Sequence, residues 1–345
     1  MDNELYTNII DANIEKSLYT ATEILLKGSE NNYSIIDNTL ISVCSYIGSF
    51  VSLREIKLWL EIVNCSALSL KSDNVAIKNL YSIITKMCVM CDTYKSNPTS
   101  KVGILPIKTL RSKVIDLFDD ENCSLTNSGL TKFKDILPPF DSPTFKLSLR
   151  IVSGYVRTKQ IIETKSPDED ADELSDLANM LRHSFDYILR KKFQFQTIFN
   201  PSDTDTVWFI WGIISILFQD EIIDQIYYVF SHSYKKKLKQ QRIGLLWATA
   251  LVMVYVMKKD VARNWNRKEN AIISKIEELH MELYKDIKQG FSNENTKDSD
   301  HSYDKKGIDY ILSYRPTVHQ EYDEHVTFQN NENVSETKRI KFRSK

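Results

Sequence analysis

Apolar residues recur along most of this chain at intervals of three and four, the spacing that places them on one face of an α-helix. After Glu55, for example, Ile56, Leu60 and Val63 share such a face. Turn clusters such as Ser96-Asn97-Pro98 and Pro138-Pro139 separate the periodic segments. The pattern therefore predicts helices over residues 2–28, from 52 onward, and over 74–94, 106–118, 143–164, 166–195, 208–218, 221–234, 235–259 and 268–289.

Residues that favour helix ends support several of these boundaries. Ser52-Leu53-Arg54-Glu55 has the spacing of a capping box, and Ser166-Pro167-Asp168-Glu169 combines a hydroxyl cap, a proline and first-turn carboxylates. Asp203 or Thr204 is expected to cap the helix that follows, and Gly290 is expected to end the last one.

Composition favours an all-α fold. The chain has 9 glycines in 345 residues, fewer than half of the roughly 7% in average proteins, and helices need few. Its length favours two helical lobes, at residues 1–140 and 141–292. From 293 to 345 the sequence is polar, which predicts a flexible C-terminal tail.

The charge of the chain and the length of its apolar runs indicate where in the cell it is expected to lie. The formal net charge is −1, so attraction to a polyanion must come from local clusters. The runs 207–218 and 243–257 are shorter than the roughly 20 residues of a spanning helix, and no membrane insertion is expected. Five cysteines and a start without a secretory signal favour the reducing cytoplasm. The basic end, residues 338–345, could alternatively direct the chain to the nucleus.

Motifs for catalysis, metals and cofactors are missing from the sequence. It contains neither a glycine-rich phosphate loop nor a paired-glycine serine elbow, so we expect no enzyme and no cofactor. Cys88 and Cys91 have the spacing of half a zinc site, but a second pair of ligands is lacking and the neighbours are apolar. We therefore expect both thiols to be core residues.

Between residues 207 and 268 the chain carries two basic clusters that are interleaved with aromatic residues. On helices, Lys235, Lys239 and Arg242 would share one face, and Lys259, Arg263 and Arg267 another. One interpretation is a solvated face that covers the core; the other is a groove for an anion. The predicted nucleic-acid-binding residues are Lys235, Lys236, Lys239, Arg242, Lys259, Arg263, Arg267, Tyr234 and Trp265.

Cations beside aromatic rings suit single-stranded RNA better than DNA, because rings can stack on splayed bases. The sequence thus predicts a non-enzymatic structural protein that binds RNA without reading its sequence. The alternative is a helical scaffold or adaptor that binds protein partners. In outline, two helical lobes with a basic cleft and exchanged arms resemble the nucleoproteins of negative-strand RNA viruses. No residue motif carries this resemblance.

One apolar island interrupts the polar tail. Its residues are Ile308, Tyr310, Ile311 and Leu312. The island is too small to form a core but large enough to dock in a groove, so it is expected to mediate self-association with another copy of the chain.

Overall fold

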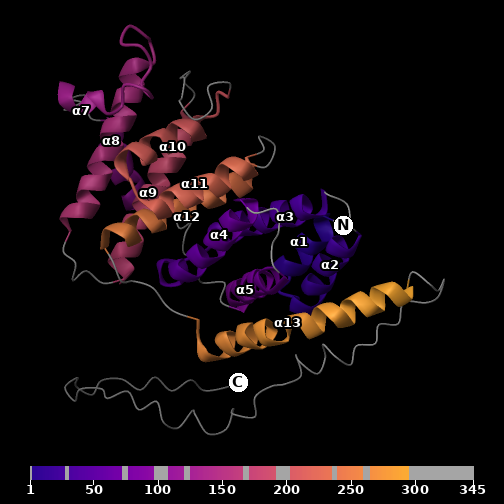
Figure 1. The fold of residues 1–345 in the computed structure, drawn as a ribbon. Helices are drawn as coiled ribbons and strands as arrows, with labels where there is room; N and C mark the ends of the chain where they lie inside the picture. The colour runs from indigo at the N-terminus through magenta and orange to yellow at the C-terminus, as the bar shows by residue number, and fades with distance from the viewer. Residues whose placement is uncertain are drawn as a thin grey trace, which may run out of the picture. The chain divides into compact units, whose positions relative to one another are not determined.

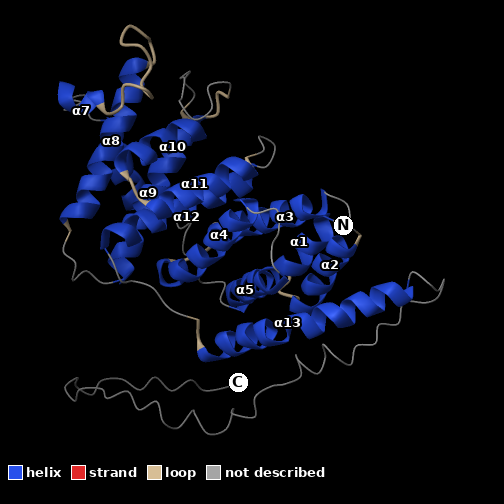
Figure 2. Cartoon of the chain, in the orientation of Figure 1, coloured by secondary structure: helices blue, strands red, loops and turns tan. Residues whose placement is uncertain are grey.

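The computed structural model describes residues 2–27, 31–71, 77–96, 108–119, 125–165, 171–191, 203–234, 239–258 and 265–294. Within these ranges the chain is helical and contains no strand, which confirms the all-α prediction (Figures 1 and 2). No helix in the described ranges has the length and apolar character needed to cross a bilayer. The predicted tail and its docking residues Ile308, Tyr310, Ile311 and Leu312 lie outside the described residues.

The first helices are α1 (Asp2–Ile10), α2 (Ile14–Leu26), α3 (Asn31–Gly48), the short 3-10 helix η1 (Leu53–Glu55), α4 (Ile56–Lys71) and α5 (Ile77–Ser96). They are followed by α6 (Lys108–Asp119), α7 (Asn127–Thr131), α8 (Phe145–Thr164), α9 (Ala171–Arg190) and α10 (Thr206–Leu217). The last are α11 (Glu221–Ser233), α12 (Lys239–Lys258) and α13 (Arg267–Glu294).

Helices from the two halves of the sequence pack against each other. α12 contacts α3 and α9, α11 contacts α4, and α13 contacts α5 and α2 (Figure 1). The amphipathic α13 buries Ile273, Ile276, Leu283 and Ile287. The predicted division into lobes at about residue 140 stays a prediction, but these contacts join helices on both sides of it.

Three predicted boundaries are wrong. The expected single helix 2–28 breaks at Ala12, whose φ is 60°, and the Asn13 side chain caps α2 by accepting from the Lys16 backbone N–H. Gly290 lies inside α13, which continues past it to Glu294. The cap of α10 is Asp205 instead of Asp203 or Thr204. Asp205 accepts from the Val207 backbone N–H, whereas Asp203 accepts from the backbone N–H of Asp205.

Other local signals act as the sequence predicts. The Glu55 carboxylate accepts hydrogen bonds from the backbone N–H of Ser52, at 3.2 Å, and from its hydroxyl, at 2.6 Å. These bonds form the expected polar start before α4. Cys88 and Cys91 are buried on α5, as their apolar setting predicts.

Helices α3 and α12 cross closely at two glycines. A Cβ atom added to Gly244 would lie 2.0 Å from the backbone oxygen of Ser45, and one added to Gly48 would lie 2.9 Å from the backbone oxygen of Gly244. Real Cβ atoms do not approach oxygen that closely, so neither position accepts a larger residue without helix movement. The two backbones can touch only because both side chains are absent.

We predict that Gly244→Ala lowers the free energy of unfolding by about 3 kcal/mol, at the upper end of typical overpacking costs. Gly290→Ala is the matched control, because nothing lies within 4 Å of its added Cβ. In the helix interior it should raise stability by about 0.5–1 kcal/mol. Urea unfolding followed by circular dichroism measures both; a Gly244→Ala protein as stable as the parent would contradict the close crossing.

Candidate nucleic-acid interface

The structure describes only part of the predicted interface. Lys235, Lys236, Lys259 and Arg263 lie outside the described residues, and Lys239 and Arg242 are placed only by their backbone in the first turns of α12. Side chains are described for Tyr234, Trp265 and Arg267. The predicted convergence of all these residues in one groove therefore stays a prediction.

Tyr234 directly follows α11 and points toward the start of α10. Its hydroxyl donates to Asp203 Oδ2 at 2.5 Å and lies 3.3 Å from Asp205 Oδ2. Its ring packs on the buried indole of Trp208, with centroids 4.6 Å apart. Because Asp205 also caps α10, Tyr234 ties the end of one helix to the beginning of another.

Trp265 contacts the N-terminal helices. Its indole N–H donates to Glu61 Oε2 at 3.1 Å, and the same carboxylate forms an ion pair with the nearly buried Lys86 of α5. The next residue, Asn266, forms a reciprocal cap with Glu269: each backbone N–H donates to the other side chain. Trp265 thus helps to fix the start of α13 against α4 and α5.

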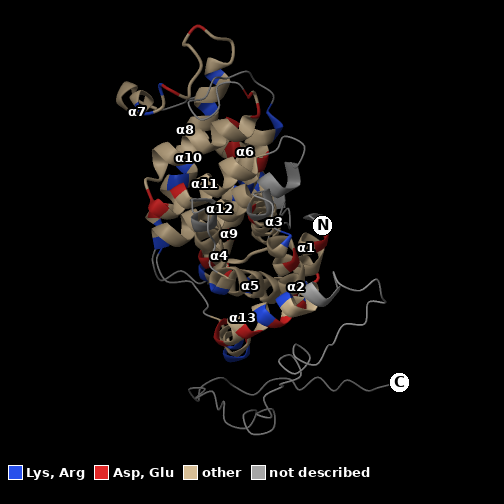
Figure 3. Cartoon of the chain, turned by 45° about the vertical axis from the view of Figure 1, so that its right-hand side comes forward, with Lys and Arg blue, Asp and Glu red and all other residues tan. Residues whose placement is uncertain are grey.

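Arg267 is exposed in the first turn of α13. Trp265 and Asn266 before it are not helical, so no continuous helix relates Arg267 to Lys259. The second predicted stripe, which assumed helical spacing from Lys259 to Arg267, is therefore wrong in that respect. Figure 3 also shows basic and acidic residues interspersed along α13.

Three cations outside the predicted interface contact backbone carbonyls at helix ends. Arg150 Nε donates to Phe118 O near the end of α6 at 3.1 Å, and Lys159 Nζ donates to Leu217 O at the end of α10 at 2.8 Å. Lys258, a member of the second basic cluster, donates to the carbonyl of Lys165, which follows α8. Such contacts satisfy carbonyls that lack a partner within their own helix. Arg182 of α9 differs, because it donates to one carbonyl inside α12 and to one just after α3.

Arg182 is the most deeply placed of these cations, at 7% exposure. Its guanidinium donates to Trp247 O of α12 at 3.3 Å and to Val51 O, just after α3, at 3.2 Å. Burial lowers its pKa to about 10. Sequence reasoning missed this residue, although its spacing from Leu174 and Ala178 places it on the apolar face of α9.

Asp37 of α3 is a half-buried carboxyl without a sequence signal. Its Oδ1 atom is inaccessible and has no hydrogen-bond partner. Burial raises the pKa of this carboxyl to about 6. The folded protein therefore holds this proton more tightly than the unfolded chain does.

The described residues show no group of three or more His, Cys, Asp or Glu side chains placed to bind a metal ion. Burial raises the pKa of Cys88 to about 12, despite a hydrogen bond to Ser17, which disfavours a reactive thiolate. The described chemistry is that of helix packing and capping.

Comparison with known proteins finds no matching family model, no matching curated protein and no matching solved structure.

We predict that Arg182→Met lowers the free energy of unfolding by roughly 1–3 kcal/mol, because the buried Val51 carbonyl loses its donor. Arg150→Met is the control: Arg150 also contacts a helix-end carbonyl, but it is half-exposed, and water can replace it. Its loss should cost less than about 1 kcal/mol. Equal effects in urea unfolding would show that the burial of Arg182 adds nothing.

A second prediction concerns Asp37 and pH. Because its pKa in the folded state is raised to about 6, its contribution to stability is full below about pH 4 and falls as pH rises toward 6. Asp37→Asn should therefore stabilise the protein at neutral pH and leave it nearly unchanged at pH about 4. Thermal melts across this range measure the effect. Asp116→Asn removes a charge from an exposed site; the same change in both variants would point to net charge instead.

Proposed function

We propose that this chain is a non-enzymatic protein that binds the sugar-phosphate backbone of single-stranded RNA through the cations at the start of α12. The observation that carries the proposal is the position of this helix end. α12 begins at Lys239, so Lys239 and Arg242 lie in its first turns, and the sequence Lys235-Lys236-Lys237 immediately precedes it.

A helix N-terminus is itself positive, because its first backbone N–H groups have no partner within the helix. Cations placed there repel this partial charge instead of neutralising it. No acidic residue lies in the first turn of α12. A bound phosphate would accept from the backbone N–H groups of a helix N-terminus and neutralise the side-chain charges.

Aromatic stacking has a smaller part in the proposal than the cations. The ring of Tyr234 already packs on Trp208, and the polar atoms of Tyr234 and Trp265 are bonded to carboxylates of this chain, so both rings already serve the fold. Contact with phosphates would be made by the cations of α12 and does not depend on stacking by these rings. The proposed binding is therefore electrostatic and independent of base sequence.

A helical scaffold that binds protein partners is the second candidate. It is favoured by the cations that contact helix-end carbonyls, since Lys258, Lys159 and Arg150 serve the fold in this way. Under this interpretation the remaining lysines form a solvated surface.

We predict that full-length protein binds a fluorescent single-stranded RNA of about 16 nucleotides, a common site size, with an affinity that falls with salt. For about five phosphate contacts the slope of log K against log salt is roughly −3 to −4 between about 50 and 200 mM. Lys239→Glu with Arg242→Glu should make this slope shallower by about 1.4. Fluorescence anisotropy measures both quantities.

The control is Lys78→Glu with Lys285→Glu, which makes the same charge change at exposed positions of α5 and α13. If both pairs weaken binding equally, the interaction is a property of net charge and not of the α12 start. Absence of salt-dependent binding in the parent would exclude the RNA proposal and favour the scaffold.

A further inference from the structure

The hydroxyl group of Tyr234 joins the end of α11 to the start of α10. It donates to Asp203 Oδ2 at 2.5 Å and lies 3.3 Å from Asp205 Oδ2. Hydrogen bonds to ionised carboxylates are roughly twice as strong as those between neutral groups. We call these three residues the carboxylate anchor. The anchor fixes the chain at Tyr234 to α10 as well as to α11.

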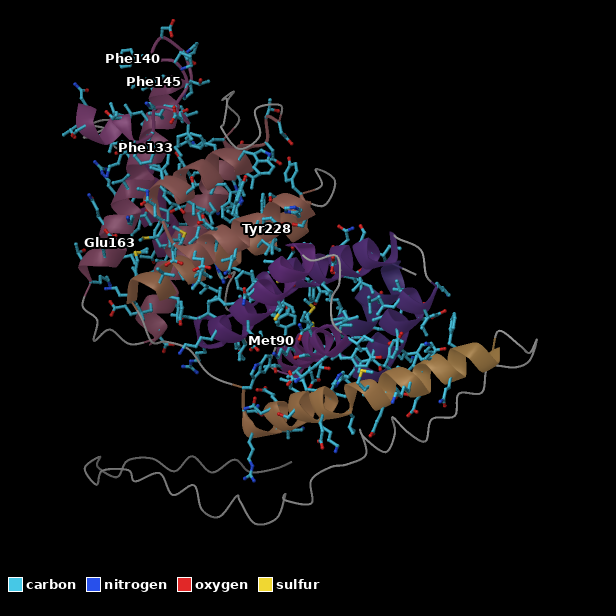
Figure 4. The ribbon with its side chains drawn as sticks, viewed as in Figure 1. Met90, Phe133, Phe140, Phe145, Glu163 and Tyr228 are labelled. Carbon is cyan, nitrogen blue, oxygen red and sulfur yellow. The ribbon has the colours of Figure 1, made fainter. Side chains whose placement is uncertain are left out.

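The ring of Tyr234 is held by neighbours on the same two helices. It packs on Trp208 of α10, with centroids 4.6 Å apart, and on Phe230 of α11, with centroids 6.1 Å apart. Both of these neighbours are buried. Earlier on α11, the ring of Tyr228 packs instead on His232 of its own helix, with centroids 4.1 Å apart (Figure 4). Tyr234 therefore connects two helices through both its ring and its hydroxyl.

The position of Tyr234 in the sequence links the carboxylate anchor to the proposed RNA site. The lysine run 235–237 follows Tyr234 directly, and α12 begins at Lys239, five residues after it. Five residues span at most about 18 Å, and α11 contacts α12. The anchor therefore limits how far the beginning of the basic run can lie from the first turns of α12.

We propose that Tyr234 is a positioning residue for RNA binding, an inference that rests on the function proposed above. By holding the chain where the lysine run begins, the anchor lets these lysines and the cations of α12 meet the same stretch of RNA backbone. Counterion release grows with the number of phosphates that are neutralised together. A positioned run of cations therefore binds more tightly and with a steeper dependence on salt.

The two carboxylates of the anchor act on RNA only through Tyr234. As negative charges beside the proposed site they repel phosphate, so their direct electrostatic effect opposes binding. Their hydrogen bond to Tyr234 favours it. Removal of a carboxylate charge alone and removal of the hydrogen bond are therefore expected to have opposite effects on RNA affinity.

The test measures fluorescence anisotropy of the same single-stranded RNA with full-length Tyr234→Phe protein between about 50 and 200 mM salt. This variant removes the hydroxyl and keeps the ring and every charge. We expect the slope of log K against log salt to become shallower by about 0.7–1.4, the loss of one or two phosphate contacts. A purely structural defect lowers the folded fraction, which reduces K without a shallower slope of this size.

Tyr187→Phe is the matched control. The Tyr187 hydroxyl also donates to a carboxylate, Asp119 Oδ1 at 3.1 Å, but this bond joins α9 to α6. Its loss should leave the slope unchanged. Asp203→Asn keeps an acceptor for Tyr234 and removes one charge, so it should keep the parent slope and bind at least as tightly. Asp203→Ala removes that acceptor and should show the shallower slope.

Three results would overturn the inference: a parent slope in Tyr234→Phe, the same change of slope in Tyr187→Phe, or equally tighter binding by Asp203→Ala and Asp203→Asn. Each leaves the RNA proposal in place as long as the parent shows its slope of roughly −3 to −4. Absence of salt-dependent binding by the parent excludes the RNA proposal and this inference with it. The two failures are therefore distinguishable.

Discussion

The contact on which the described fold depends most is the backbone-to-backbone crossing of α3 and α12 at Gly48 and Gly244. Arg182 of α9 lies beside this crossing and donates to Trp247 O of α12 and to Val51 O after α3. Three helices far apart in the sequence are thus joined at one point by steric fit and buried hydrogen bonds. Since α12 also contacts α11 and follows the basic cluster directly, this crossing fixes where the cations of its first turns are presented.

Long helices could be predicted because their signal is local. The apolar spacing of residues 143–164 and 221–234 identifies α8 and α11 to within two residues. Tertiary contacts could not be predicted in the same way. Gly244 and Gly290 look alike in the sequence, but the first touches Ser45, about two hundred residues away, and the second touches nothing. Contacts between residues so far apart in the sequence do not appear in its pattern of apolar and polar residues.

The candidate site shows the same limit. Composition identifies a cluster of cations and aromatic rings. It does not show which of these side chains already form contacts within the fold. Trp265 meets Glu61 of α4, and Tyr234 meets Asp203 some thirty residues upstream. Arg182 was recoverable, because a charged residue on the apolar face of a predicted helix must find partners when that face is buried.

Whether a cation serves the fold or remains available for a ligand depends on which end of a helix it meets. At a C-terminus, unpaired carbonyls accept from lysine and arginine, and Arg150, Lys159 and Lys258 are held there. At an N-terminus the backbone presents donors, which cannot accept from a cation. Lys239 and Arg242 belong to the first turns of α12, which is why the proposal places a bound polyanion at this helix start.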